Sequence, residues 1–171
     1  MKKILIMGII LLAGLSILFL FLKNPRTTAS FITSRTFERS EDVLFIREIV
    51  KYPSNVTIIS PENPSNVPIG IVGDAWNLNF GILPVGVNGK RFVNVANYNE
   101  PLSKIKLLCY GNICPMITFD KNDFILHKGD EDKITVHLST SSFSPGDYSG
   151  EIHILSEIPQ NSFISVLLGW S

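Results

Sequence analysis

The chain has 171 residues, 45% of them hydrophobic, and its fifteen basic and fifteen acidic side chains leave a formal net charge of zero. This length suits one folded domain with an appended segment rather than two full domains. The neutral balance gives no electrostatic basis for binding nucleic acid or an acidic membrane surface, because both partners require clustered Lys and Arg side chains.

The first predicted element is residues 4–22, an uncharged apolar run whose only polar side chain is Ser16. As an α-helix, with a rise of about 1.5 Å per residue, this run is long enough to cross the hydrocarbon core of a bilayer. A cleavable signal peptide has a shorter apolar core that ends in small residues, whereas this run passes into a Lys-Asn-Pro-Arg sequence. We therefore predict a single N-terminal transmembrane signal anchor over residues 1–23. The alternatives are a signal peptide that is removed and a buried helix of a soluble protein.

The residues that flank the anchor predict its orientation. Lys2 and Lys3 favour a cytoplasmic N-terminus, while Lys23 and Arg26 on the other side oppose that bias. The short tail before a first apolar segment is typical of a signal anchor, which places the body outside the cytoplasm. Residues 24–42 are polar, rich in Ser, Thr and Arg, and are predicted to form a stalk. The sequence thus predicts a single-pass membrane protein with an extracytoplasmic C-terminal domain.

Residues 43–171 change to short β-branched runs separated by turns rich in Pro, Gly and Asn, with no sustained helical spacing. Apolar and polar side chains alternate over most of the second half. The strands that this alternation predicts are residues 91–97, 105–107, 117–119, 124–126, 134–138 and 152–154. The apolar run 163–170 is predicted to be the last strand. Period-two patterning with frequent turns indicates an antiparallel β-sandwich with one buried face per strand.

An ordered series of motifs runs from residue 78 to residue 155: LNFGILPVG, RFVNVAN, PLSKI, ITFDKNDFILHKGDEDKITVHL and SPGDYSGEIHI. In this order the motifs resemble the Ig-like β-sandwich domains of the ASH/MSP/Hydin type, and still more the related domains of archaeal and some bacterial surface proteins. The matching positions are Phe80, Gly81, Pro84, Gly86, Asn97, Pro101, Leu102, Phe124, Leu126, Gly129, Pro145, Gly146, Tyr148 and Gly150. The resemblance implies an Ig-like fold and no particular function, because this fold is a general interaction and spacer module. Residues 43–76 and the cysteine pair have no counterpart in it.

The first of these motifs also has a physical interpretation. Phe80 is expected to fill the core, and Gly81 to remove a side chain where the strand bends or crosses between sheets. Pro84 and Gly86 are expected to turn the chain, and Asn97 to end the strand that follows. The motif is therefore interpreted as a folding signal rather than a functional site.

The only two cysteines, Cys109 and Cys114, flank a Gly-Asn turn. Outside the cytosol such a pair is predicted to form a disulfide that closes a hairpin loop. A redox-active pair would need a helix N-terminus or a basic neighbour to lower a thiol pKa, and zinc would need two further ligands. Reduced, buried thiols are the alternative that fits a cytosolic body.

Other candidate ligands are scattered along the chain. His127, His137 and His153 are predicted to lie on the surface, with His137 and His153 on strands of opposite sheets and no metal site between them. Residues 130–132, Asp-Glu-Asp, are predicted to be a solvated turn, with a low-affinity calcium site as the alternative.

Asn55 begins a glycosylation sequon that is predicted to lie on a loop beside a strand. Trp76 and Trp170 are predicted to fill the core, with exposed contact positions as the alternative. The sequence contains no catalytic triad order, nucleophile elbow or phosphate-binding loop, so no enzyme activity and no cofactor are predicted.

These observations predict a non-enzymatic, membrane-anchored extracytoplasmic protein that makes protein–protein contacts in an archaeal cell envelope or surface assembly. The alternative is a stator, minor pilin or linker subunit of a surface filament or secretion apparatus. Such a subunit would form homo- or hetero-oligomers by strand pairing through residues 43–50 or 163–170. An enzyme and a cytosolic tethered adaptor are the remaining alternatives; MSP-type adaptors carry their anchor at the C-terminus, whereas this chain carries it at the N-terminus.

Overall fold

The computed structural model describes residues 31–60 and 76–170. The predicted anchor, residues 4–22, lies outside the described residues. Within residues 31–60 and 76–170, no helix is long and apolar enough to cross a membrane. The elements are β1 (Thr36–Glu41), β2 (Phe45–Ile59), β3 (Leu78–Pro84), β4 (Asn88–Ala96), β5 (Leu102–Gly111), the 3₁₀ helix η1 (Cys114–Met116), β6 (Ile117–Phe119), β7 (Phe124–His127), β8 (Glu131–Ser139), β9 (Gly146–Pro159) and α2 (Ser162–Leu167).

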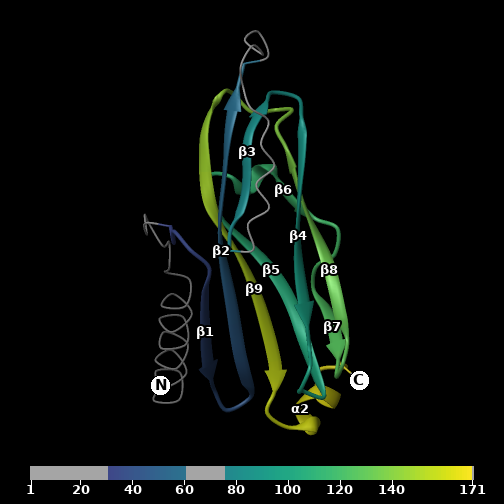
Figure 1. The fold of residues 1–171 in the computed structure, drawn as a ribbon. Coiled ribbons are helices and arrows are strands. Elements are labelled where there is room, and N and C mark those ends of the chain that lie inside the picture. The colour runs from purple at the N-terminus through teal and green to yellow at the C-terminus, as the bar shows by residue number, and fades with distance from the viewer. Residues whose placement is uncertain (1–30, 61–75, 171) are drawn as a thin grey trace, which may run out of the picture. The chain divides into compact units, whose positions relative to one another are not determined.

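Two sheets build the described domain, and nearly all of their strand pairs are antiparallel (Figure 1). The larger sheet has the order β1-β2-β9-β5-β7, with β3 also paired to β2. The smaller sheet has the order β4-β8-β6. This arrangement confirms the predicted all-β sandwich, and the parallel β2–β3 pair is an exception to the predicted antiparallel pairing.

β2 is the longest described strand, and two strands share one of its edges. Residues 46–51 pair antiparallel with β1, and residues 54–59 pair in parallel with β3. β9 occupies the opposite edge of β2 along nearly its whole length. β1 and β3 therefore follow one another along the same edge of the larger sheet.

The hydrophobic core lies between the two sheets, where the alternating side chains of both inner faces meet. Its most deeply buried aliphatic members are Val56, Ile58, Leu107, Ile113, Ile134, Val136, Leu138 and Ile152. The predicted strands around residues 134–138 and 152–154 thus place their apolar positions in the core. Ile158 and Ile164 are also buried but do not belong to this cluster, so they mark a smaller apolar centre beside α2.

β3 bends at Gly81, as the sequence predicts. Asn79 pairs with Asn55 and Ile82 pairs with Thr57, so two residues of β3 oppose one residue of β2. This is the register of a β-bulge. Gly81 has a φ of 73°, a conformation that glycine adopts without the steric cost of a side chain.

Phe80 fills the core, where it is 5% exposed. Its ring lies against the backbone of Gly89 on β4, since a Cβ at Gly89 would stand 2.9 Å from Cδ1 of Phe80. The chain crosses between sheets after β3 rather than within it, through a turn that contains Gly86 at a φ of 88°. The motif therefore joins the two sheets at one edge of the sandwich.

The prediction of a stalk over residues 24–42 is wrong for residues 36–41, which form β1. Most of their side chains are polar and exposed, so they carry no period-two signal. An edge strand is held by backbone hydrogen bonds and tolerates charged side chains on its surface. Ion pairs of Arg39 with Glu48, and of Glu38 with Lys51, add to the pairing with β2.

The prediction of a last strand over residues 163–170 is also wrong, because this segment contains the helix α2. Asn161 caps the helix, and its side chain accepts a hydrogen bond from the backbone N–H of Ile164 at 3.1 Å. A short apolar run does not distinguish a strand from a helix by periodicity. The polar Gln-Asn-Ser sequence before the run was the signal for a helix start.

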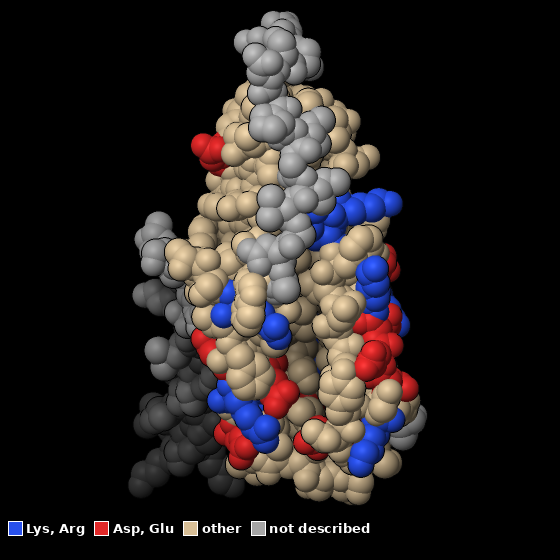
Figure 2. All heavy atoms as spheres, in the orientation of Figure 1, with Lys and Arg blue, Asp and Glu red and all other residues tan. Residues whose placement is uncertain are grey.

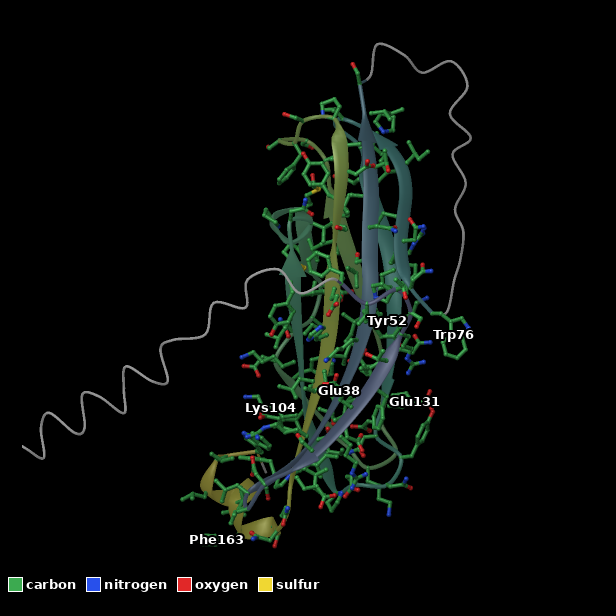
Figure 3. All side chains as sticks on the ribbon, turned by 90° about the vertical axis from the view of Figure 1, so that its left-hand side faces the viewer. Glu38, Tyr52, Trp76, Lys104, Glu131 and Phe163 are labelled. Carbon is green, nitrogen blue, oxygen red and sulfur yellow. A yellow bond between two sulfur atoms is a disulfide. The ribbon has the colours of Figure 1, made fainter. Side chains whose placement is uncertain are left out.

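The prediction that both tryptophans fill the core is wrong for Trp76, which is 63% exposed and points away from the strands (Figure 3). Trp170 is half-buried. Its ring centroid lies 5.6 Å from that of Phe45, and Nζ of Lys104 lies 5.5 Å from it. Trp170 therefore packs at the α2 end of the larger sheet, outside the main core.

Candidate interaction surfaces

The acidic turn at residues 130–132 does not direct its carboxylates to one point. Asp130 accepts a hydrogen bond from a backbone N–H, Glu131 accepts one from a tyrosine hydroxyl, and Asp132 forms an ion pair with a lysine. Each carboxylate thus has its own partner. In the described part of the chain, no group of three or more His, Cys, Asp or Glu side chains is arranged to hold a metal ion.

The three histidines lie on three different strands. His137 on β8 and His153 on β9 belong to opposite sheets, which confirms that prediction. His127 is exposed and His137 is half-buried. The prediction of a surface position is wrong for His153, which is only 8% exposed.

His153 is buried because other groups cover the outer face of β9. Its ring centroid lies 4.5 Å from that of Tyr110, and its Nε2 lies 2.7 Å from Oε2 of Glu151. The backbone N–H of Ile32 donates to the other carboxylate oxygen at 2.7 Å. Burial acts to raise the pKa of Glu151, but the hydrogen bonds from His153 and Ile32 outweigh it, so this pKa lies below its ordinary value. Glu151 and His153 therefore attach the segment around Ile32 to the larger sheet.

The sulfurs of Cys109 and Cys114 lie within disulfide-bonding distance, as predicted, with their Cα atoms 5.5 Å apart. The bridge joins the end of β5 in the larger sheet to η1, which leads into β6 of the smaller sheet. It therefore fixes the connection between the two layers at this point.

Replacing both cysteines with serine is expected to lower the free energy of unfolding by about 2 kcal/mol, because so short a loop places the entropic effect at the low end of the usual range. Urea denaturation of the oxidised wild type and of C109S/C114S measures this difference. Reductant should destabilise the wild type by the same amount and leave the variant unchanged. A wild type that is insensitive to reductant would contradict the bridge.

Asn55 lies within β2, between β3 and β9, rather than on the predicted loop. The loop prediction is wrong because β3 pairs in parallel with this polar segment and continues the sheet across it. The Asn55 side chain is exposed, and Thr57 of the sequon donates a hydrogen bond to Oδ1 of Asp147 at 2.6 Å. Glycosylation of Asn55 stays a prediction.

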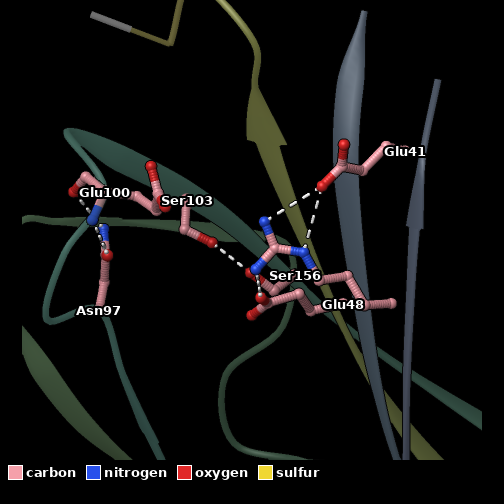
Figure 4. Close-up of polar contacts among 7 residues, drawn as sticks. Glu41, Glu48, Asn97, Glu100, Ser103 and Ser156 are labelled. Atoms are coloured by element: carbon pink, nitrogen blue, oxygen red, sulfur yellow. Dashed lines mark hydrogen bonds and ion pairs between the residues drawn. The ribbon is translucent and has the colours of Figure 1, made fainter.

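Polar side chains cross the inner face of the larger sheet towards its α2 end (Figure 4). Arg39 contacts Glu41 at 3.2 Å and Glu48 at 3.0 Å. Ser103 and Ser156, on β5 and β9, have their Oγ atoms 2.6 Å apart. The buried Ser103 is satisfied by Ser156, as a buried polar group requires, whereas Arg39 and Glu41 pair at the exposed edge of the sheet. We interpret them as structural.

Asn97 has the strand-ending role that the sequence predicts. It is 6% exposed, and its side-chain amide donates to the carbonyl oxygens of Glu100 and Leu126, both at 3.0 Å. Its Oδ1 accepts a hydrogen bond from the backbone N–H of Glu100 at 3.1 Å. These bonds fix the turn after β4 and join it to β7.

Exposed apolar side chains gather where α2 lies beside the turn between β1 and β2 (Figures 1 and 3). This surface, the apolar end, consists of Val43, Leu44, Phe163, Val166, Leu167 and Leu168. Val43, Phe163 and Leu167 are the most exposed, at 87%, 72% and 73%. Single exposed apolar residues are ordinary, whereas a contiguous group indicates a binding surface.

Hydrogen bonds hold the two parts of the apolar end together. The backbone N–H of Gln160 donates to the carbonyl oxygen of Leu44 at 3.0 Å, and its side-chain amide donates to that of Asp42 at 2.6 Å. The contact between Phe45 and Trp170 adds an apolar link behind them. The β1–β2 turn and the α2 segment therefore form one connected surface rather than two separate ones.

The apolar end carries no charge of its own, since residues 43–46 and 158–170 contain no Asp, Glu, Lys or Arg. In Figure 2 the lowest part of the described surface is correspondingly free of charged side chains. Asp42, which precedes Val43 in the sequence, accepts hydrogen bonds from the N–H groups of Phe45 and Leu44 and pairs with Arg47. These contacts, led by the bond from Phe45, lower the pKa of Asp42.

A second surface lies on the outer face of the β4–β8 pair. This aromatic face consists of Phe92, Asn94, Tyr98, Glu131 and Lys133. Phe92 and Tyr98 are 53% and 65% exposed. Nζ of Lys133 lies 4.0 Å from the Phe92 ring centroid, and the Tyr98 hydroxyl donates to Glu131 at 2.9 Å, a bond that raises the pKa of Tyr98. Exposed aromatic side chains are enriched at protein–protein interfaces.

The two segments predicted to pair with other subunits already form regular structure within the domain. Residues 46–50 are paired on both edges, with β1 and with β9. Residues 162–167 are helical. Within residues 31–60 and 76–170, residues 46–50 therefore have no free strand edge and residues 162–167 form no strand, and oligomerisation by strand pairing stays a prediction.

Comparison of the chain with protein-family models, curated proteins and solved structures found no match. The resemblance of residues 78–155 to Ig-like domains of the ASH/MSP/Hydin type therefore stays a prediction.

Proposed function

We propose that this chain is a non-enzymatic, membrane-anchored Ig-like domain protein that makes protein–protein contacts in a cell envelope or surface assembly, with its domain outside the cytoplasm. The observation that carries the proposal is the aromatic face. Phe92 on β4 and Tyr98 in the turn after β4 are each more than half exposed and add little to the core. Side chains of this kind contribute most when a partner protein covers them.

Three features support the rest of the proposal. The uncharged run at residues 4–22 supports the membrane anchor. The disulfide of Cys109 and Cys114 supports an oxidising, extracytoplasmic location. The two packed antiparallel sheets, together with the motifs of residues 78–155, support the Ig-like assignment.

The carboxylates with lowered pKa support a non-enzymatic function, because each of them serves the fold. Hydrogen bonds from Thr135 lower the pKa of Asp120, and bonds from backbone N–H groups lower that of Asp42. Glu151 is occupied by His153 and by the N-terminal segment. These groups are hydrogen-bond acceptors in turns and between strands.

The double variant F92A/Y98A is expected to lose its protein partner, because truncating two exposed anchors removes the centre of the interface. The full-length protein is cross-linked in its native membrane, purified under denaturing conditions and analysed by mass spectrometry. The recovered envelope protein should fall at least about tenfold relative to wild type, as expected for a loss of 1.4 kcal/mol or more.

Thr118→Ala is the matched control, since Thr118 is exposed on β6 of the same sheet. It should recover the partner at the wild-type level. If F92A/Y98A recovers the same partner at the wild-type level, the interface does not lie on the aromatic face. A wild-type sample that yields no envelope protein would refute the proposed function.

A further inference from the structure

We infer that the apolar end docks into the surface of a lipid bilayer, the one that holds the chain's predicted anchor. This inference rests on the membrane anchoring of the proposed function. It adds a second membrane contact, made by the folded domain itself, and leaves the aromatic face for the protein partner.

Packing within the domain does not account for the apolar end. α2 turns Ile164 and Ser165 towards the sheets, where both are buried. An amphipathic surface helix would place polar side chains on its opposite side. Instead, α2 presents Phe163, Val166 and Leu167 there, each more than 60% exposed. Apolar side chains thus occupy both sides of this short helix, which indicates an apolar environment outside the domain.

Shape and charge favour lipid over protein as that environment. A turn and a short helix project beyond the ends of the strands, with Phe163 at their extremity (Figures 1 and 3). A projecting, uncharged surface suits insertion to about 5–10 Å at the boundary of headgroups and acyl chains. Trp170 lies directly behind it with Lys104 against its ring, the pairing of an amphipathic ring and a cation that is typical of the membrane–water interface.

The covalent connection is long enough for this contact. Eight residues, 23–30, separate the apolar run from Phe31, where the described domain begins. Fully extended, they span about 28 Å. The backbone of Ile32 is held by Glu151, eight positions before the end of β9 at Pro159. Those eight positions correspond to about 26 Å of strand. A chain that leaves the bilayer at residue 23 therefore reaches Ile32 while the apolar end touches the same bilayer.

Quenching of tryptophan fluorescence by brominated lipid tests the contact, because the chain has only Trp76 and Trp170. The reporter is W76F/W170F/F163W, with its single indole at the apolar end; the control, W170F, keeps only Trp76, outside the apolar end. Both are reconstituted at full length in phosphatidylcholine vesicles with plain or 6,7-dibrominated acyl chains. We expect at least about twofold quenching of the reporter and none of the control. The quenching should be equal in 0.1 M and 1 M NaCl, since the inserted side chains are uncharged and phosphatidylcholine carries no net charge.

Co-flotation with the vesicles separates this inference from the proposed function. Protein that fails to float refutes the anchor and both proposals with it. Protein that floats but shows an unquenched reporter overturns only the lipid contact, and cross-links between copies at residue 163 would then assign the apolar end to a protein interface. Adding V166S/L167S to the reporter should abolish quenching while flotation continues; persistent quenching would also overturn the contact.

Discussion

Gly150→Ala is expected to lower the free energy of unfolding by about 3 kcal/mol and the Tm by roughly 10 °C. Gly150 lies in the middle of the larger sheet, opposite Ser54 of β2 and Gly111 of β5. A Cβ at this position would overlap the carbonyl oxygen of Tyr110 and stand 2.8 Å from Cγ2 of Ile113. The overlap involves backbone, so neighbouring strands must separate to relieve it.

Gly86→Ala provides the control, because a side chain at Gly86 would strain the backbone without overlapping any atom, whereas one at Gly150 would overlap its neighbours. Gly86 has a φ of 88° but no atom within 4 Å of a Cβ placed on it. Its replacement should cost only the conformational strain, about 1 kcal/mol. Urea denaturation of both variants gives the comparison. A Gly150 variant that is no less stable than the Gly86 variant would show that β5 and β9 do not approach as closely as described.

Phe80→Ala is expected to lower the free energy of unfolding by about 3–5 kcal/mol, the range for truncating a buried phenylalanine. The Phe80 ring lies against Gly89 on β4, and the guanidinium carbon of Arg91 stands 5.7 Å from its centroid. Removing the ring leaves a cavity where β3 of the larger sheet meets β4 of the smaller one. Chemical denaturation measures the loss.

Phe92→Ala is the matched comparison, since Phe92 lies on β4, the next strand along the chain, and is 53% exposed. Its truncation should change the free energy of unfolding by no more than about 0.5 kcal/mol. Equal losses at Phe80 and Phe92 would contradict the assignment of Phe80 to the core. The same pair separates a folding residue from a candidate contact residue in one experiment.

The strands of the second half could be predicted because each of them buries a single face. Val93 and Val95 on β4, and Ile134 and Val136 on β8, are buried, while the residues between them are at least partly exposed. This alternation is local information that a sequence carries. Gly81 could likewise be predicted, since a strand bulge favours the one residue without a side chain.

The elements that were predicted wrongly depend on tertiary contacts. β1 has no apolar period, and its strand conformation comes from pairing with β2. His153 occupies an outward position in β9 and is nevertheless buried, because Tyr110 and the segment around Ile32 cover it. Neither covering group lies near His153 in the sequence, so periodicity alone assigns it to the surface.

The two candidate surfaces differ in how far the sequence reveals them. Phe92 is an aromatic residue at an outward position of an alternating strand, and that exception to the pattern was a usable signal. The apolar end could be recognised only from the structure, because a strand over residues 163–170 would turn different side chains outward than the helix α2 does. The pairing of β2 with β9 also brings residues 43 and 163, which are far apart in the sequence, to the same end of the domain.

The shared edge of β2 has a mechanical consequence. Tension applied through the N-terminal segment reaches the domain first at the hydrogen bond between Ile32 and Glu151, and then at the open end of the β1–β2 hairpin. It acts there as a peeling force that breaks one β1–β2 residue pair at a time. Because β3 holds the other part of that edge, the core strands stay in register while β1 detaches. The six residues of β1 then lengthen the tether by about 20 Å, which lets the domain yield to a pull without unfolding.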